Sequence, residues 1–147
     1  MVAPQVSQPD SLQRFIDAQR DSYDSALAEI RRGRKISHWM WFIFPQIAGL
    51  GRSPTAQYYA LASRAEGRAY LAHPLLGARL LDCVGALQDL TSGSTESIFG
   101  TIDAMKLRSS LTLFEAAGAP PMIAAALDRW FGSARDAATL DLIGNDD

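Results

Sequence analysis

The sequence contains too little cysteine and histidine, and too little positive charge, for several common classes of protein. Its 147 residues include one cysteine and two histidines, which excludes an internal disulfide and argues against a zinc site built from these residues. Fourteen basic and sixteen acidic side chains leave a net charge of -2, so the chain lacks the overall positive charge that binds nucleic acid. We therefore expect no metal site and rank nucleic acid last among partners.

Long hydrophobic runs are missing as well. The longest run of bulky apolar residues, Trp39 to Phe44, is far shorter than the ~20 residues that span a bilayer. Residues 1–9 have neither the basic nor the apolar region of a signal peptide. We expect no membrane partner and a cytoplasmic location. Two prolines in residues 1–9 indicate a flexible N-terminal tail, and residues 145–147 form a second expected tail around a single domain at 10–144.

The residues that are present favour a helical domain. Apolar residues make up 48% of the chain and charged residues 20%, which excludes intrinsic disorder. Apolar side chains from Leu12 to Ile30 recur every three or four positions and predict one long helix ended by Gly33. We find neither convincing alternating hydrophobic runs nor hairpin signals. The sequence therefore predicts an all-α fold, a single compact globular domain of about seven to nine helices, with Ser133 capping the last.

The most unusual stretch runs from Arg31 to Gln46. Four cations and His38 lead into the aromatic segment WMWFIF, which stops at Pro45 and predicts a short helix over Ser37–Phe44. A buried strand is the alternative for the same segment. In a functional interpretation, the cations hold an anion such as phosphate and the aromatic rings stack on a planar ligand. In the alternative interpretation, the aromatic side chains are core and the cations are a solvated helix end. Composition alone favours the second interpretation.

Two further segments have polar groups that could bind an anionic ligand. The loop from Gly49 to Pro54 leads into a helix N-terminus, where free amide groups bind anions, although an ordinary turn before a capped helix is the commoner meaning of this pattern. Lys106, Ser109 and Ser110 are three and four residues apart, so they share one helix face. The alternative for these hydroxyls is a hydrogen bond to a backbone carbonyl one turn back.

Three blocks of the sequence together resemble a known family. They are KISHWMWFIFPQIAGLGRSP from Lys35 to Pro54, YLAHPLLGARL from Tyr70 to Leu80, and DAMKLRSSLTLF from Asp103 to Phe114. These blocks closely resemble a bacterial domain-of-unknown-function family, DUF1810, which is often mislabelled as calpastatin. The resemblance spans Leu12 to Ile143 and implies a single, mostly helical cytosolic domain. It brings no established activity and no cofactor. We expect the protein to have no cofactor.

We hypothesise that the domain binds an anionic, ring-bearing small molecule, such as a nucleotide or an ADP-ribose-like riboside. A likeness in arrangement to enzymes that handle NAD-derived ribosides is an analogy only. The hypothesis requires His38, Gln46, Arg79 and Lys106 to line one hollow, and it leaves open whether the protein is an enzyme and whether it is a monomer or a homodimer. The candidate residues are His38 as a general acid or base and, for ligand binding, Lys35, Trp39, Trp41, Gln46, Arg79, Lys106 and Ser110.

The alternative hypothesis assigns no ligand. In it, the protein is a non-enzymatic protein-interaction module or a homodimer, and WMWFIF supplies an apolar interface patch. It requires the tryptophan side chains of that segment to be exposed in the monomer.

Overall fold

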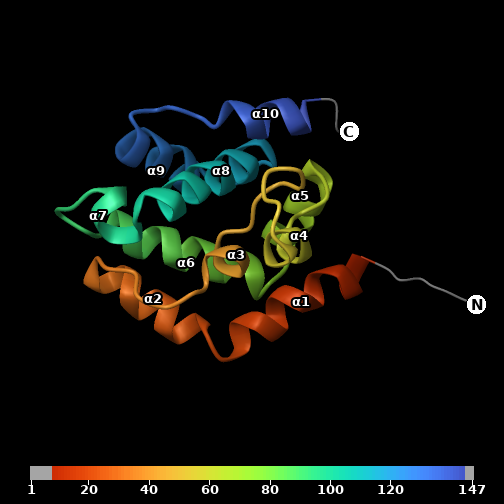
Figure 1. Cartoon of the computed structure of the whole chain (residues 1–147), viewed down its shortest axis with the longest axis horizontal. Helices are drawn as coiled ribbons and strands as arrows, with labels where there is room; N and C mark the ends of the chain where they lie inside the picture. Colours follow the sequence, from red (N-terminus) through yellow and green to blue (C-terminus); the bar gives the residue numbers. More distant parts are fainter. Residues whose placement is uncertain (1–7, 145–147) are drawn as a thin grey trace, which may run out of the picture.

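The structure confirms the predicted all-α class. It is a computed structural model that describes residues 8–144, with side chains from residue 12 onward. The expected tail at 145–147 and most of the expected tail at 1–9 lie outside the described residues, although α1 already begins at Gln8. No helix in the described range is both long and apolar enough to span a membrane. The ten helices in this range (Figure 1) are α1 (Gln8–Arg20), α2 (Tyr23–Arg32), α3 (Met40–Ile43), α4 (Pro54–Tyr59), α5 (Arg64–Ala72), α6 (Leu76–Gln88), α7 (Thr95–Phe99), α8 (Thr101–Ala116), α9 (Pro121–Phe131) and α10 (Ala137–Ile143).

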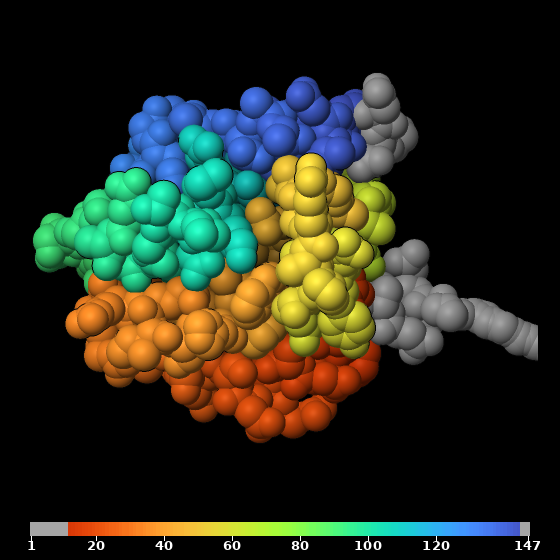
Figure 2. Space-filling model, viewed as in Figure 1, coloured from red at the N-terminus to blue at the C-terminus, as the bar shows by residue number. Residues whose placement is uncertain are grey.

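Helix α8 lies at the centre of the helix packing. It packs against α5, α7, α9 and α10, and α3 also touches it. Helix α6 packs against α2, α5 and α9. In Figure 1, α1 and α2 form one outer layer and α9 and α10 the opposite one, with α3, α6 and α8 between them. Figure 2 shows the same face with side chains, where α8 reaches the surface beside the segment that carries α4.

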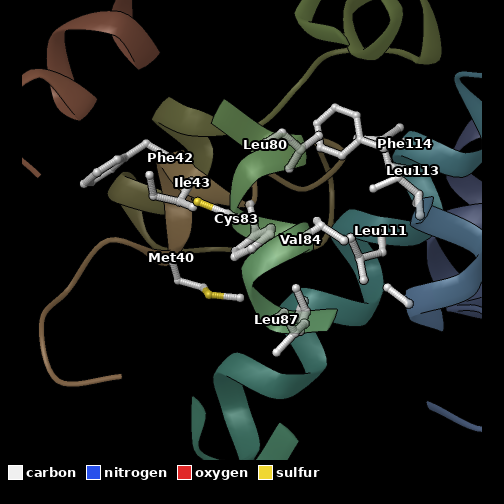
Figure 3. Packing of buried hydrophobic residues seen from close by; sticks show 14 of the residues in the cluster. Met40, Phe42, Ile43, Leu80, Cys83, Val84, Leu87, Leu111, Leu113 and Phe114 are labelled. Atoms are coloured by element: carbon white, nitrogen blue, oxygen red, sulfur yellow. The ribbon is translucent and has the colours of Figure 1, made fainter. Parts of the chain in front are cut away.

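The core lies between α6, α8 and α3. Apolar side chains of α6 and α8 pack against one another, and α3 covers them from the side of α1 (Figure 3). In the segment WMWFIF only Trp41 is partly exposed, and the other five side chains are buried. The segment is therefore a structural part of the core. The labelled core residues are Met40, Phe42, Ile43, Leu80, Cys83, Val84, Leu87, Leu111, Leu113 and Phe114.

The predicted long first helix is in fact two helices. It breaks at Asp21 and Ser22, between α1 and α2, and both residues have side chains that compete with helical hydrogen bonding. The break lets α1 pack on α3 while α2 packs on α6. Near the end of α1 the buried Gln19 donates from Nε2 to the backbone oxygen of Phe42 at 2.7 Å, which ties α1 to α3. One stripe on a straight helix cannot reach both partners.

Several predicted helix ends are confirmed and one is wrong. Gly33 follows α2 with φ of +75°, and Ser53 caps α4 by accepting a hydrogen bond from the amide of Ala56 at 3.1 Å. Ser133 does not cap the last helix. Asp136, three residues further on, does so, accepting from the amide of Thr139 at 3.0 Å, while its own amide donates to Thr112 on α8.

The segment before α3 is held by one buried carboxylate. The backbone amides of Ile36 and Ser37 donate to Glu29 Oε1 at 2.7 and 2.9 Å, and the indole N–H of Trp39 donates to the same oxygen at 2.9 Å. The Ser37 hydroxyl donates to Oε2. Because these donors fix residues 36–39 in a non-helical turn around Glu29, only Met40–Ile43 of the predicted helix is helical.

The same hydrogen bonds lower the pKa of Glu29. Burial by itself raises the pKa of this carboxyl, but the hydrogen bonds from Ser37, Ile36 and Trp39 outweigh it and lower the pKa from 4.5 to about 2. A carboxyl whose pKa is lower in the folded state than in the unfolded chain stabilises the fold above the unfolded pKa. This stability is lost as the pH falls from 4.5 towards 2.

We expect Glu29→Gln to lower the free energy of unfolding at pH 7 by about 3 kcal/mol, because each unit of pKa difference corresponds to about 1.4 kcal/mol. Urea denaturation at a series of pH values measures the difference between the two proteins, which should shrink below pH 4.5. Glu96→Gln, at an exposed position, is the matched control and should stay within about 0.5 kcal/mol of the wild type. A difference that does not change between pH 7 and pH 2.5 would contradict the assignment.

Candidate functional site

A surface hollow of about 350 Å³ lies where α8 meets the loop after α3 and the start of α10. Figure 2 shows this face, with α8 in teal, the loop that precedes α4 in amber and yellow, and α10 in blue beside it. The walls are mostly apolar and include a few polar side chains, as in many small-molecule sites. The lining residues are Gln46, Leu50, Gly51, Ile102, Met105, Lys106, Ser109, Asp136 and Ala138.

The loop wall of the hollow is fixed by backbone contacts. Pro45 follows α3, and the amide of Leu61 donates to the backbone oxygen of Gln46 at 2.9 Å, while the amide of Ala48 donates to that of Leu61 at 2.8 Å. A Cβ on Gly51 would lie 2.4 Å from the Ala56 Cβ, so only glycine allows the loop to pass this close to α4. The loop is the turn before a capped helix that its sequence pattern most often means, and its Leu50 and Gly51 line the hollow, whereas anion binding by its amides stays a prediction.

Gln46 and Lys106 are two of the four polar residues that line the hollow. The carboxamide of Gln46 makes no hydrogen bond to any described residue, whereas its backbone oxygen is engaged. The Lys106 ammonium lies 5.0 Å from the centre of the Trp41 ring, a cation–π contact that leaves its N–H donors available. A free amide and an ammonium thus face a hollow whose other walls are largely apolar.

Lys106 shares its carboxylate partner with a second lysine. Asp103 Oδ2 lies 2.9 Å from Lys35 Nζ, and Asp103 Oδ1 lies 3.8 Å from Lys106 Nζ. Lys35 also donates to the backbone oxygen of Ser37 at 2.7 Å. The Lys35 side chain is 8% exposed, so its pairing with Asp103 is the closer and the more buried of the two. Two ammonium groups therefore contact one carboxylate, and of these three residues Lys106 is the one that lines the hollow.

Several predicted site residues have structural contacts elsewhere. Trp39 is buried and bound to Glu29, so it offers no face to a ligand. Arg79 donates to the Gln19 side chain at 3.3 Å and lies 4.5 Å from the centre of the Tyr23 ring. Neither residue lines the hollow. The sequence pattern could not separate them from ligand-binding residues, because their partners are distant in the chain.

His38 and Ser110 are also outside the lining of the hollow. His38 is exposed and makes no hydrogen bond within the described part of the chain, and its role as an acid or base stays a prediction. Ser110 is completely buried, and its hydroxyl has no hydrogen-bond partner among the described residues. Its neighbour Ser109 does line the hollow and donates to the backbone oxygen of Met105 at 3.1 Å. Of the four side chains expected to converge, Gln46 and Lys106 line one hollow and His38 and Arg79 do not, so the predicted four-residue site is not formed.

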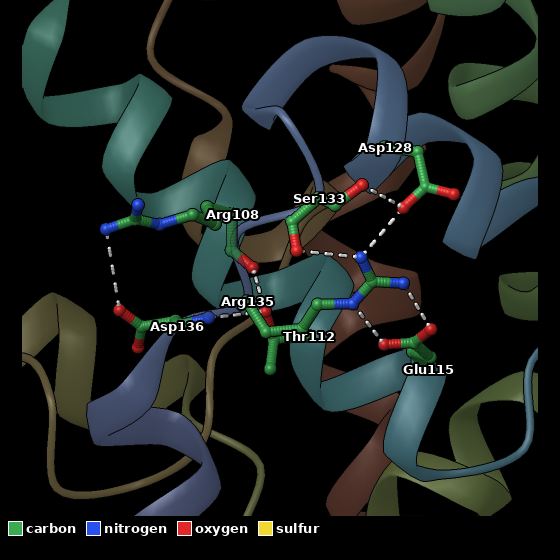
Figure 4. A network of polar contacts seen from close by, with 7 residues as sticks. All are labelled: Arg108, Thr112, Glu115, Asp128, Ser133, Arg135 and Asp136. Atoms are coloured by element: carbon green, nitrogen blue, oxygen red, sulfur yellow. Dashed lines mark hydrogen bonds and ion pairs between the residues drawn. The ribbon is translucent and has the colours of Figure 1, made fainter.

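Asp136 is a lining residue that sequence reasoning missed. Its amide donates to the Thr112 hydroxyl on α8 at 3.0 Å, and its carboxylate caps α10. Next to it, Arg135 donates twice to Glu115, at 2.8 and 2.6 Å, and once to Asp128 at 2.9 Å (Figure 4). These hydrogen bonds from Arg135 lower the pKa of both carboxyls. Because Arg135 is not adjacent in sequence to Glu115 or Asp128, no local sequence pattern reveals these pairs.

The fold and this hollow define a small all-α protein with a partly polar surface hollow beside its most contacted helix. The chain belongs to the family described as protein of unknown function (DUF1810), which matches it over residues 9–143. Among solved structures, the conserved hypothetical protein Rv1873 from Mycobacterium tuberculosis is 45% identical, with a TM-score of 0.90 over 92% of this chain and 98% of that chain. None of the curated proteins compared with the chain matches it. These findings confirm the resemblance seen in the sequence.

We expect Asp103→Asn to lower the free energy of unfolding by roughly 1–3 kcal/mol, because it leaves the largely buried Lys35 ammonium without its carboxylate. Urea denaturation at pH 7 measures the loss. Asp17→Asn is the matched control, since Asp17 pairs with Arg20 on an exposed surface and should cost less than about 0.5 kcal/mol. Equal losses in the two variants would contradict the special position of Asp103.

Proposed function

We propose that this protein binds a small anionic molecule with a planar or apolar part in the hollow beside α8. The observation that carries the proposal is the pairing of an unengaged Gln46 carboxamide with the Lys106 ammonium in one mostly apolar hollow. Lys106 binds the anionic group, and Gln46 donates to or accepts from a polar edge of the ligand. Nucleoside monophosphates have this combination of groups.

The charges around the hollow support an anion. Lys35 and Lys106 share Asp103, which leaves one positive charge in excess. Asp136, the acid that lines the hollow, is engaged by the amide and hydroxyl of Thr139 at 3.0 and 2.6 Å at the start of α10. Its negative charge therefore faces the positive end of that helix, and the ligand meets mainly the ammonium of Lys106.

The size and walls of the hollow suit one ring. A volume of about 350 Å³ lies at the lower end of the usual range for small-molecule sites. Leu50, Ile102 and Met105 form the apolar walls, and the side chains of Ile102 and Met105 are 70% and 58% exposed. A bound ring would cover these apolar groups, and their removal from water would contribute to the affinity.

No specific observation favours the interaction-module alternative. It requires WMWFIF at the surface, and in the structure Trp39 is 1% exposed while Trp41 lies half-buried under Lys106. The aromatic segment therefore has a packing role that already accounts for its composition.

Titration calorimetry with adenosine, uridine and guanosine monophosphates and with ribose 5-phosphate tests the proposal. We expect at least one of them to bind, and Lys106→Met to weaken that binding at least tenfold, because a charge-assisted hydrogen bond contributes roughly 1.5–3 kcal/mol. Gln46→Leu should weaken it by a smaller factor.

The matched controls are His38→Ala and Arg20→Met, which remove polar groups outside the hollow. Both should bind the same ligand within a factor of two of the wild type. The proposal is wrong if none of the four compounds binds, or if Lys106→Met binds as tightly as Arg20→Met.

A further inference from the structure

A second hollow lies on the other side of the same methionine. It has a volume of about 230 Å³, and Met105 lines it as well as the first hollow. Successive residues of an α-helix are turned by about 100°, so residues 102, 106 and 109 lie on one side of Met105 and residues 101, 104 and 108 on the other. The residues around the second hollow are Thr95, Glu96, Thr101, Ala104, Met105, Arg108 and Phe131.

Arg108 is unusual because its guanidinium makes no hydrogen bond to any described residue. Its Nε is closed off from solvent and has no partner, and its nearest acid, Asp136, lies at 3.9 Å, which is beyond hydrogen-bond distance. A guanidinium has five N–H donors, and buried donors are nearly always paired. The neighbouring Arg135 shows the usual state, with four hydrogen bonds to Glu115, Asp128 and the backbone of Ser133 (Figure 4).

The Arg108–Asp136 pair spans the boundary between the two hollows. Arg108 lines the second hollow and Asp136 lines the first. The carboxylate of Asp136 is already bound to Thr139 at the start of α10, so it compensates the charge of Arg108 only weakly. The Arg108 side chain is 33% exposed, so it presents a weakly compensated positive charge to the second hollow, which shares Met105 with the first.

We infer that Arg108 binds a second anionic group of the same ligand, and that the ligand is a nucleotide with two separate phosphates rather than a monophosphate. One phosphate lies at Lys106 and the other at Arg108, and the part that joins them crosses the exposed side chain of Met105. Thr95 and Thr101 line the second hollow together with Arg108. This inference rests on the proposed function, because it assigns the first phosphate to Lys106.

The carboxylate of Glu96 is expected to weaken binding of a phosphate at Arg108. Its exposed carboxylate lines the second hollow and is not paired with Arg108. A phosphate bound at Arg108 is repelled by this carboxylate, whereas a phosphate at Lys106 lies in the other hollow. Glu96→Gln should therefore raise the affinity for the doubly phosphorylated nucleotide by about two- to fivefold, as a screened surface charge does, and leave that for a monophosphate unchanged.

Two pairs of nucleotides test the inference by titration calorimetry. They are adenosine 5′-monophosphate against adenosine 3′,5′-bisphosphate, and NAD against NADP. In each pair the second compound carries one additional phosphate, and the distance from that phosphate to the other phosphate groups differs between the pairs. We expect the added phosphate to raise the affinity at least tenfold in one pair, and Arg108→Met to reduce that advantage to less than twofold. Arg108→Met should bind the compound of the pair that lacks the added phosphate within a factor of two of the wild type.

The controls separate this inference from the proposed function. Arg20→Met removes a positive charge on α1 and should keep the advantage, and Arg108→Gln repeats the test with a polar side chain. Because the Arg108 guanidinium makes no hydrogen bond to any described residue, both Arg108 variants should melt no lower than the wild type without ligand. If monophosphates bind through Lys106 but the second phosphate adds nothing, or adds as much in Arg108→Met, the inference is wrong and the proposed function stands. If none of the nucleotides binds, both are wrong.

Discussion

The carboxylate of Glu29 is the interaction on which the candidate site depends. It holds Ile36, Ser37 and Trp39 in one turn, and this turn sets the position of Lys35, whose ammonium donates to the backbone of Ser37. Lys35 in turn contacts Asp103 at the beginning of α8, and Asp103 is shared with Lys106. A buried acid on α2 is thus connected, through four successive polar contacts, to the ammonium of Lys106, which lines the hollow.

Helix α8 links the core to the surface that carries the site. Its buried side supplies Leu107, Leu111 and Phe114 to the core, while Met105 and Lys106 reach the surface between two hollows. Because α5, α7, α9 and α10 all pack on it, the helix cannot move without disturbing the fold. The side chains of its outer face are therefore presented on a rigid element, which is what a preorganised binding site requires.

Much of the fold could be predicted from the sequence, because helix periodicity and caps are local. Gly33 and the helix start after the loop from Gly49 to Pro54 occur where the pattern placed them. The break between α1 and α2 could not be predicted, since the apolar stripe continues through it and only the different packing partners of the two helices separate them. Ser133 was a wrong cap for the same reason, because contacts to α8 decide where α10 begins.

The candidate site was predictable in part. Gln46 and Lys106 were singled out as polar residues near an aromatic block and a glycine loop, and they do line one hollow. Trp39 and Arg79 have the same residue types as ligand contacts, but their partners Glu29, Gln19 and Tyr23 lie far enough along the chain that no spacing reveals them. Sequence reasoning missed Asp136 and Arg108, because the two side chains come close together only in the folded structure.

The central claim is that a nucleotide occupies the hollow beside Lys106. The most direct test is a two-dimensional NMR titration of the isotope-labelled protein with adenosine 5′-monophosphate. The account predicts saturable shifts of backbone amide signals around Gln46, Gly51 and Lys106, with the signals of Tyr23 and Arg79 unchanged. Shifts confined to the surroundings of Arg79, or no shift at millimolar nucleotide, would contradict it.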